Sequence, residues 1–438
     1  MPLLQVATVG GCLQEVVTVS VIVDEPVVAR VCAIDIGKAN LVACVRVPHD
    51  GAPGRRAQQG RGLGTDTRAL LKLADWLRCQ GVELVAMEAT SDYWKPVFYL
   101  LEAQGFTCWL LNARHVKNVP GRPKTDKLDA VWLAKVIEAG MCRPSLVHPA
   151  PNSRLRDLTR YRRTLVRERT REKARLEKVL EDAQIKLDSV ISDLLGVSGR
   201  EMLEAMVAGE RNPAVLAQMA RGPMRAKLAR LHDALTGSFD DHHALLCATM
   251  LRRIDALTGE IATLDLVVTH HCEPYAEIVR RLDEIPGVGL RSAEELIAEI
   301  GVDMSVFPTA AHLVSWAKFA PIDRQSAGTK KGGSTGKGNP WLAATLGEVV
   351  AGLARTHTFL GDRYRRLARR RGKKRALVAV GNSVLTILWH LLSDPQSRFH
   401  DLGADYHQTR INPHRRQRDL IRQLEHLTGQ TVVLRPTA

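Results

Sequence analysis

The chain has 438 residues, 45% of them hydrophobic, and this length and composition predict two or three globular domains with a sizeable core. Its 62 Lys and Arg residues outnumber 47 Asp and Glu residues, and the formal net charge of +15 favours a nucleic-acid partner over the alternative of a merely basic enzyme. Eight cysteines without a CxxC pair argue against structural zinc and for a reducing, cytoplasmic compartment, and the lack of an 18-residue apolar run argues against a membrane partner.

The first part of the chain is expected to be an α/β domain. Residues 1–28 lack the basic start and cleavage site of a signal peptide, so we expect a loosely attached extension. Residues 29–150 alternate between strand and helix patterns, which predicts a mixed sheet covered by helices. The expected strands are Val31–Ile36 and Leu41–Val47, joined as a hairpin, then Glu83–Met87 and Thr107–Leu111, and the expected helices are Asp66–Cys79, Trp94–Gln104 and Lys127–Ala139.

Residues 151–275 are expected to form a helical, coiled-coil region. The stretch Ser153–Leu187 contains no Gly or Pro, and arginines crowd its first half. A second stretch, Leu245–Val268, carries apolar residues at helical spacing. Both patterns predict long helices, possibly a pair, which serve as a spacer or oligomerisation arm rather than in catalysis. We expect the arginines Arg154–Arg171 to contact nucleic-acid backbones.

The last third is expected to be a second, helical domain over residues 276–395, followed by a basic and partly disordered tail over residues 396–438. Gly287-Val288-Gly289 resembles the turn of a helix-hairpin-helix motif, whose amides can hold a DNA phosphate. The domain is expected to contain a helix over Leu290–Ile300, a glycine- and lysine-rich loop over Ser326–Asn339, and helices from Pro340 to Leu392 that the basic run Arg365–Arg375 interrupts.

Four carboxylates have positions that suggest a metal site. Asp35 stands near the end of the first strand and Glu88 at the end of a later one, where a charge is costly unless it is paired or binds a cation. Asp126 and Asp129 lie three residues apart at a helix start and therefore on one helix face. Such oxygen ligands suit Mg²⁺ or Mn²⁺, which can hold a scissile phosphate.

Each carboxylate also has a plainer interpretation. Asp35 could be a turn residue, Glu88 an ordinary polar strand end, and Asp126 a helix cap. Their joint placement, with the basic neighbours Arg122 and Lys124 expected to contact nucleic acid, favours the metal site.

The glycine- and lysine-rich loop carries two candidate nucleophiles, Ser326 and Ser334. Its glycine spacing does not match a P-loop, and no His–Asp pattern accompanies either serine, so neither nucleotide hydrolysis nor a hydrolase triad is supported. From the residues alone, the loop is a phosphate-contacting segment without chemistry of its own. The cations expected to bind nucleic acid in this half of the chain are Lys330, Lys331, Lys337, Arg365, Arg366, Arg369 and Arg370.

The order of these motifs resembles bacterial insertion-sequence transposases of the IS110 type and the related pilin-gene invertases. Two segments are specific: Gly121–Ala130, which contains Thr-Asp-Lys-Leu-Asp-Ala, and the stretch from Ser326-Ala327-Gly328 to Lys337-Gly338-Asn339-Pro340-Trp341-Leu342. The matching stretches together span Ala33 to about Leu392, over four-fifths of the chain.

The resemblance implies a RuvC-like, RNase H-type domain whose Asp-Glu-Asp-Asp tetrad matches Asp35, Glu88, Asp126 and Asp129. It implies a helical transposase domain whose catalytic serine matches Ser326 and becomes covalently linked to DNA. Further implications are a composite site of the two domains, guidance by a non-coding bridge RNA that pairs with donor and target DNA, and action as a tetramer.

Two other functions remain open at this point. A Holliday-junction or RNase H-type nuclease would use the same carboxylates with metal-activated water and would need no serine. A non-catalytic DNA- or RNA-binding protein could keep the fold without the chemistry, although the presence of all four carboxylates weighs against it.

Overall fold

The computed structural model describes residues 28–52, 54–89, 91–112, 126–322, 324–326, 328–331, 333–409 and 413–433. The chain folds as two compact units, Met1–Ala150 and Pro151–Ala438. The extension expected over residues 1–28 lies, apart from Val28, outside the described residues. The finer subdivision into domains stays a prediction.

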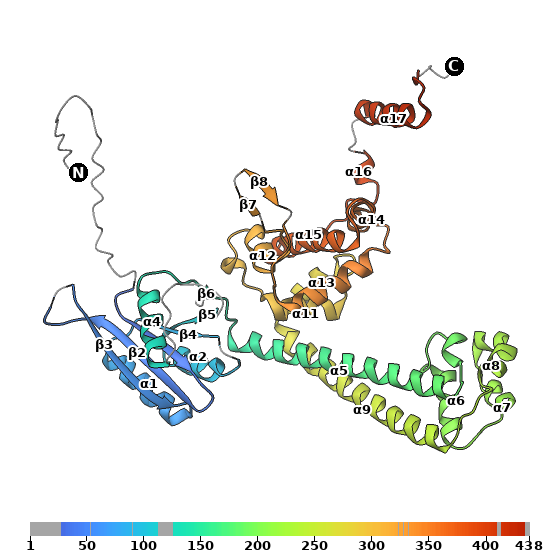
Figure 1. Cartoon of the computed structure of the whole chain (residues 1–438), viewed down its shortest axis with the longest axis horizontal. Helices are drawn as coiled ribbons and strands as arrows, with labels where there is room; N and C mark the ends of the chain where they lie inside the picture. Colours follow the sequence, from blue (N-terminus) through green and yellow to red (C-terminus); the bar gives the residue numbers. More distant parts are fainter. Residues whose placement is uncertain are drawn as a thin grey trace. The chain divides into compact units, whose positions relative to one another are not determined.

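The first unit is built on one six-stranded mixed sheet (Figure 1). Its strands are paired antiparallel along β3–β2–β1, parallel along β1–β4–β5, and antiparallel between β5 and β6. The expected mixed α/β organisation is therefore confirmed. In sheet order the strands are β3 (Arg56–Gly64), β2 (Asn40–Pro48), β1 (Val31–Ile36), β4 (Leu84–Glu88), β5 (Thr107–Leu111) and β6 (Pro144–Ser145).

Helices cover both faces of this sheet, and the strand residues alternate between the two cores. Ile34 and Met87 pack toward α1 (Thr67–Cys79) and α2 (Trp94–Ala103). Ala33 and Ala86 pack toward α4 (Asp126–Glu138) on the opposite face. The strand and helix positions expected from the sequence are confirmed to within a few residues.

β3 is a strand that the sequence pattern does not reveal. Its residues, Arg-Ala-Gln-Gln-Gly-Arg-Gly-Leu-Gly, lack the apolar alternation of a half-buried strand, and most of them are exposed. It lies at the sheet edge and pairs with β2 alone among the described strands, from Arg56 opposite Pro48 to Gly64 opposite Asn40. An edge position tolerates this polar, glycine-rich composition because one side of the strand faces solvent.

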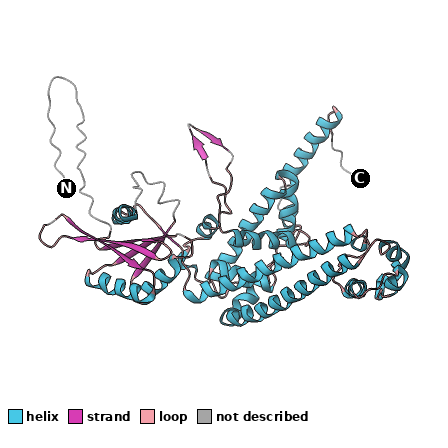
Figure 2. Cartoon of the chain, turned by 60° about the horizontal axis from the view of Figure 1, so that its bottom comes forward, coloured by secondary structure: helices cyan, strands magenta, loops and turns pink. Residues whose placement is uncertain are grey.

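The second unit starts with the two expected long helices, α5 (Ala150–Asp182) and α9 (Asp241–Cys272), which run antiparallel and side by side (Figures 1 and 2). Leu165 of α5 packs against Leu257 and Ile261 of α9. Their apolar stripe is therefore partly buried within a single chain, and an oligomerisation role, which stays a prediction, requires other faces. At the far end of the pair lie α6 (Val197–Val207), α7 (Pro213–Gln218) and α8 (Leu228–Ala234).

Several further helices of this unit pack around α15 (Lys373–Ser393). By length and composition alone α15 could cross a membrane, which the sequence analysis did not anticipate. It buries Val380, Val384 and Leu388 and contacts four neighbouring helices, which is the packing of a core helix. Those neighbours are α10 (Ala276–Asp283), α12 (Ala310–Trp316), α13 (Pro340–Leu353) and α14 (Phe359–Arg371), while α11 (Leu290–Ile300) packs on α10 and α13.

The basic tail contains two further helices, α16 (Tyr406–Thr409) and α17 (Pro413–Thr428). These helices cover part of the tail, and its partial disorder stays a prediction. Arg, Gln and Leu, which dominate α17, are good helix formers, so a polar and basic composition does not exclude a helix there.

Candidate active site

Asp35 and Glu88 stand at the same end of two neighbouring strands. β1 and β4 are parallel, with Ile34 opposite Met87, so the residues that follow each of these are adjacent. Glu88 is 7% exposed, and Asp35 is half-buried. The register thus brings two carboxylates together at one edge of the sheet, as the sequence predicted for strand ends.

The start of α4 belongs to the same face. Because strand residues alternate, Asp35 and Glu88 lie on the face that α4 covers. α4 begins at Asp126, whose side chain lies outside the described residues, and Asp129 follows within the first turn and is half-buried. Leu133, one turn after Asp129, packs into the core between α4 and the sheet. Two strands and one helix therefore direct three of the predicted carboxylates to one side of the sheet.

The donor chemistry of this face fits a hard divalent cation, since carboxylate oxygens are the ligands that Mg²⁺ and Mn²⁺ prefer. Among the residues that the structure describes, no three acidic, His or Cys side chains lie close enough to hold one ion, and Asp126 is not part of that comparison. Arg122 and Lys124, the expected basic neighbours, also lie outside the described residues.

Ser326 lies at the tip of a short hairpin that the sequence analysis treated as a loop. β7 (Arg324–Ser326) pairs antiparallel with β8 (Thr329–Lys331), with Ser326 opposite Thr329. Gly328, between the strands, has a φ of +77°, a conformation that favours glycine. Figures 1 and 2 show the hairpin projecting away from the helices of its own unit. The side chains of Ser326, Lys330 and Lys331 lie outside the described residues, so their roles stay predictions.

Two glycines of the loop are needed at the base of the hairpin. A Cβ atom at Gly333 would lie 2.1 Å from the carbonyl oxygen of Ile322, and one at Gly338 would lie 2.5 Å from that of Ala317. The amide of Ile322 donates a hydrogen bond to the carbonyl of Ser334 at 3.1 Å. These glycines therefore allow backbone segments to approach each other, whereas the sequence analysis assigned them to phosphate contact.

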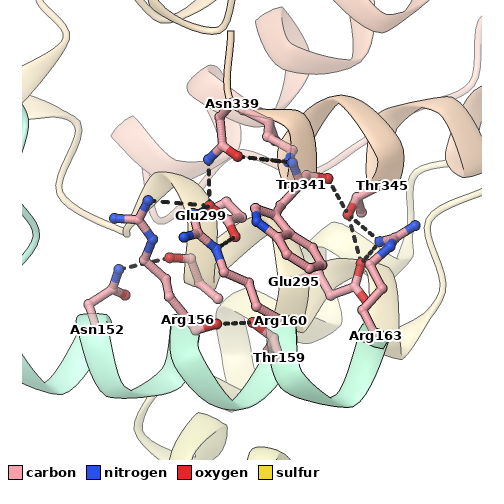
Figure 3. Close-up of polar contacts among 12 residues, drawn as sticks. Asn152, Arg156, Thr159, Arg160, Arg163, Glu295, Glu299, Asn339, Trp341 and Thr345 are labelled. Carbon is pink, nitrogen blue, oxygen red and sulfur yellow. Dashed lines mark hydrogen bonds and ion pairs between the residues drawn. The ribbon is translucent and has the colours of Figure 1, made fainter. Parts of the chain in front are cut away.

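The loop ends on a buried ionic cluster (Figure 3). Asn339 caps α13 through its Oδ1, which accepts from the amide of Trp341 at 3.0 Å, and its Nδ2 donates to Glu299 of α11 at 2.5 Å. Glu299 is 2% exposed. Arg160 of α5 donates to both its carboxylate oxygens at 2.7 and 2.8 Å, and Arg156 lies 3.4 Å away. The segment that carries Ser326 is thereby fixed to helices α5 and α11.

A second cluster lies one turn further along α5. The buried Arg163 donates to Glu295 at 2.5 Å and to the hydroxyl of Thr345 at 2.8 Å, and it also pairs with Glu348. Burial raises the pKa of Glu295, despite the hydrogen bond from Thr345 and the charge of Arg163. Burial acts in the same direction on Glu299, but the hydrogen bond from Arg160 and the charges of its arginines outweigh it and leave that pKa lowered. The partners of Glu299 thus outweigh the effect of burial on its pKa, whereas those of Glu295 do not.

These clusters give four arginines of α5 partners within the chain, and for the others in Arg154–Arg171 contact with nucleic acid stays a prediction. Arg156, Arg160 and Arg163 are used within the chain, and Arg162 pairs with Asp265 of α9. Their placement on a helix side that packs against other helices explains the difference, because a charge on such a side needs an internal partner.

The cations predicted in the last third differ in their surroundings. Arg365 donates to the carbonyl groups of Ala354 and Thr356 at 3.2 and 2.8 Å, so its guanidinium holds the chain that follows α13. Nucleic-acid contact stays a prediction for Arg365 and for the exposed side chains Arg366, Arg369, Arg370 and Lys337.

Gly287 also has a packing role. It adopts a φ of +82°, and a Cβ atom there would lie 2.5 Å from the carbonyl oxygen of Val349 in α13. The first glycine of the Gly-Val-Gly turn therefore packs directly against α13. This packing explains why a glycine is needed there, and no phosphate contact of a helix-hairpin-helix motif is required to explain it.

Glu299, Arg160 and Asn339 support the serine-bearing segment, a role that does not follow from the sequence alone. Asn339 followed by Pro340 is the pattern of a helix cap and first residue, and Glu299 is a charge among apolar helix residues. Both signals are local, and neither identifies the partner on another helix.

Comparison with known proteins bears on both halves of the chain. Residues 32–185, which contain the four predicted carboxylates, match the model of the IS110-type DEDD transposases. Residues 279–365, which contain Ser326, match the transposase family described as IS116/IS110/IS902. The chain is also 26% identical over 231 residues to the insertion element IS110 uncharacterized 43.6 kDa protein of Streptomyces coelicolor. That alignment covers 47% of this chain and 55% of the relative, so the chain spans about half the length of that protein.

The two family matches together span more than half of the chain. The first contains the carboxylate face, the side of the sheet with Asp35, Glu88 and Asp129, and the second contains the serine hairpin, β7 and β8 with Ser326. The chain therefore belongs to the IS110 family of transposases.

Proposed function

We propose that this transposase cuts and rejoins DNA with the carboxylate face of the first unit and with Ser326. The observation that carries the proposal is the register of β1 and β4, which sets Asp35 beside the buried Glu88 on the face where α4 begins. Two neighbouring carboxylates repel each other, and a cation bound between them would relieve that repulsion. A RuvC-like fold of this unit is part of the proposal, supported by the mixed pairing of its central strands.

Asp35, Glu88, Asp126 and Asp129 are the residues that would hold the metal, Mg²⁺ or Mn²⁺. When bound, such an ion supplies charge that stabilises the attacking and leaving oxygens of a phosphate displacement. The chain's own contribution would be to bring these carboxylates to one side of the sheet, from the ends of β1 and β4 and the start of α4.

Ser326 is the proposed nucleophile. Its Oγ attacks a DNA phosphate, the Oγ–P bond forms, one bridging P–O bond breaks, and the leaving oxygen takes up a proton as a free hydroxyl. The reverse attack by a DNA hydroxyl rejoins the strand and returns the proton to Ser326, so no ATP is required. A serine hydroxyl needs a base, and residues 324–339 contain no Asp, Glu or His. The base therefore comes from outside the hairpin, and we assign this role to the carboxylates.

Guidance by a bridge RNA, binding of donor and target DNA, and a tetrameric assembly are proposed on the resemblance to the IS110 type and on the net charge of +15. Sequencing of RNA that copurifies with the protein, together with light scattering, tests both the guide and the assembly.

The carboxylates are tested by Glu88→Gln and Asp35→Asn, which keep side-chain size and remove charge. Both variants should lose strand cleavage in a nicking assay while DNA binding stays near wild type, and EDTA should act in the same way. Glu83→Gln, a change at the other end of β4, is the control and should cleave normally. Cleavage by the Glu88 variant at the wild-type rate would remove the metal site from the proposal.

A further inference from the structure

A cleft of about 1040 Å³ lies beside the base of the serine hairpin. One wall is Gly333–Thr335, the segment that leaves β8, and the other is the corner where α14 passes into α15. A ligand in this cleft therefore touches the same loop that carries Ser326.

The walls of the cleft are strongly basic. Arg363, Arg371, Lys374 and Arg375 line it, and none of the described residues that line it is acidic. In the part of the chain that the structure describes, none of these four cations has an ion pair with a carboxylate. Four positive charges that face one space repel each other, and an anion in that space relieves the repulsion.

Arg363 is the strongest indication of a ligand. Its side chain is half-buried, and its Nε is fully shielded from solvent without an acceptor among the described residues. Burial, followed by the charge of Arg366, lowers the pKa of its guanidinium. A shielded donor without an acceptor costs free energy, so Arg363 is poised to bind an anion that enters the cleft.

The remaining lining selects the kind of anion. Pro321, Leu367 and Val378 supply apolar surface, while Ser334, Thr335 and Asn382 supply polar groups. Apolar surface beside cations suits unpaired nucleotides. Their bases can pack on the apolar side chains, and their phosphates can pair with the cations. A duplex keeps the faces of its bases stacked, so it can offer this lining its phosphates but not its bases.

We propose that this cleft binds an unpaired DNA strand next to the serine hairpin. The assignment to DNA rather than RNA rests on the proposed function, because the strand held at Ser326 in that reaction is DNA. The chemistry of an unpaired, phosphate-bearing strand follows from the lining alone.

The test uses the full chain, a fluorescent dT8 oligonucleotide, an rU8 oligonucleotide and a blunt DNA duplex in anisotropy titrations. The double variant Arg371→Gln/Lys374→Gln removes two exposed cleft cations. The matched control, Lys178→Gln/Arg230→Gln, removes the same charge from exposed residues of α5 and α8 that do not line the cleft and that are not among the residues expected to bind nucleic acid. The cleft variant should bind dT8 at least tenfold more weakly, with a salt slope reduced by about 0.7 for each lost phosphate contact, while the control changes less than about threefold.

Equal losses in the two double variants would overturn the proposal, because they would reflect net charge alone. Tighter binding of rU8 than of dT8 would overturn the assignment to DNA. If the cleft variant bound the duplex more weakly but dT8 as well as wild type does, the proposal that the ligand is an unpaired strand would be overturned. Arg363→Met should weaken dT8 binding as well, and wild-type binding by that variant contradicts its role. Failure of the proposed function would give a different result. No covalent adduct would form at Ser326, but the cleft variant would still bind dT8 more weakly than wild type does.

Discussion

The ionic cluster around Glu299 allows a quantitative prediction for Arg160→Met. The change removes a bidentate partner at 2.7 and 2.8 Å from a carboxylate whose side chain is 3% exposed. Breaking a buried pair costs about 3–5 kcal/mol. Because Arg156 remains 3.4 Å from Glu299 and Arg160 is itself 30% exposed, we expect a smaller loss of about 2 kcal/mol in the free energy of unfolding.

Thermal and urea denaturation of the full chain measure this loss, which corresponds to a decrease in Tm of about 4–8 °C. Glu299→Gln removes the charge that Arg160 compensates, so the double variant should be more stable than the sum of the single losses predicts, by about 1–2 kcal/mol. Additive losses, or an Arg160→Met variant as stable as wild type, would refute the reasoning that Glu299 is a buried charge held by this arginine.

The same cluster predicts a pH dependence. The pKa of Glu299 is lowered in the folded chain, so its stabilisation is present above the unfolded pKa, near 4.3, and is lost as the pH falls through the folded value. The stability difference between wild type and Glu299→Gln should therefore shrink in acid. A difference that stays constant from pH 7 down to the acid transition contradicts the lowered pKa.

Two further predictions concern the loop and the basic surface. Gly333→Ala should destabilise the base of the hairpin by about 1–3 kcal/mol, because its Cβ would lie 2.1 Å from the Ile322 carbonyl, whereas Gly347→Ala, which meets open space on α13, should be neutral or stabilising in the same melts. Duplex DNA affinity should fall with salt at a slope of about −0.9 per phosphate neutralised, and Arg369→Gln/Arg370→Gln should flatten that slope; an unchanged slope would leave these arginines as solvated surface.

The sequence predicts the first unit well where apolar periodicity is strong. Val31–Ile36 and Thr107–Leu111 are strands with the expected bounds, because each is a short, largely apolar run between turn residues. β3 and the hairpin β7–β8 escape prediction, since their polar and glycine-rich residues carry no burial pattern. Their pairing depends on neighbouring strands and turns rather than on local propensity.

Part of the candidate site can likewise be predicted from the sequence, and part cannot. Asp35 and Glu88 are recognisable because a charge at the end of an apolar strand is unusual, and parallel pairing then makes them neighbours. The pairing of Glu299 with Arg160 joins residues 139 positions apart, and no spacing in the sequence reveals it. The arginines of α5 show the converse: their number suggests nucleic acid, whereas tertiary packing uses several of them as internal partners.

The central claim is that Ser326 forms a covalent bond with DNA, and the most direct measurement is denaturing-gel detection of a protein–DNA adduct with labelled element ends. Wild type should form the adduct, and Ser326→Ala should form neither adduct nor recombinant product while DNA binding stays near wild type. Ser334→Ala, in the segment that lines the cleft, should retain the adduct. Cleavage by Ser326→Ala at the wild-type rate would contradict the account, because water would then be the nucleophile and the protein would act as a metal-dependent nuclease.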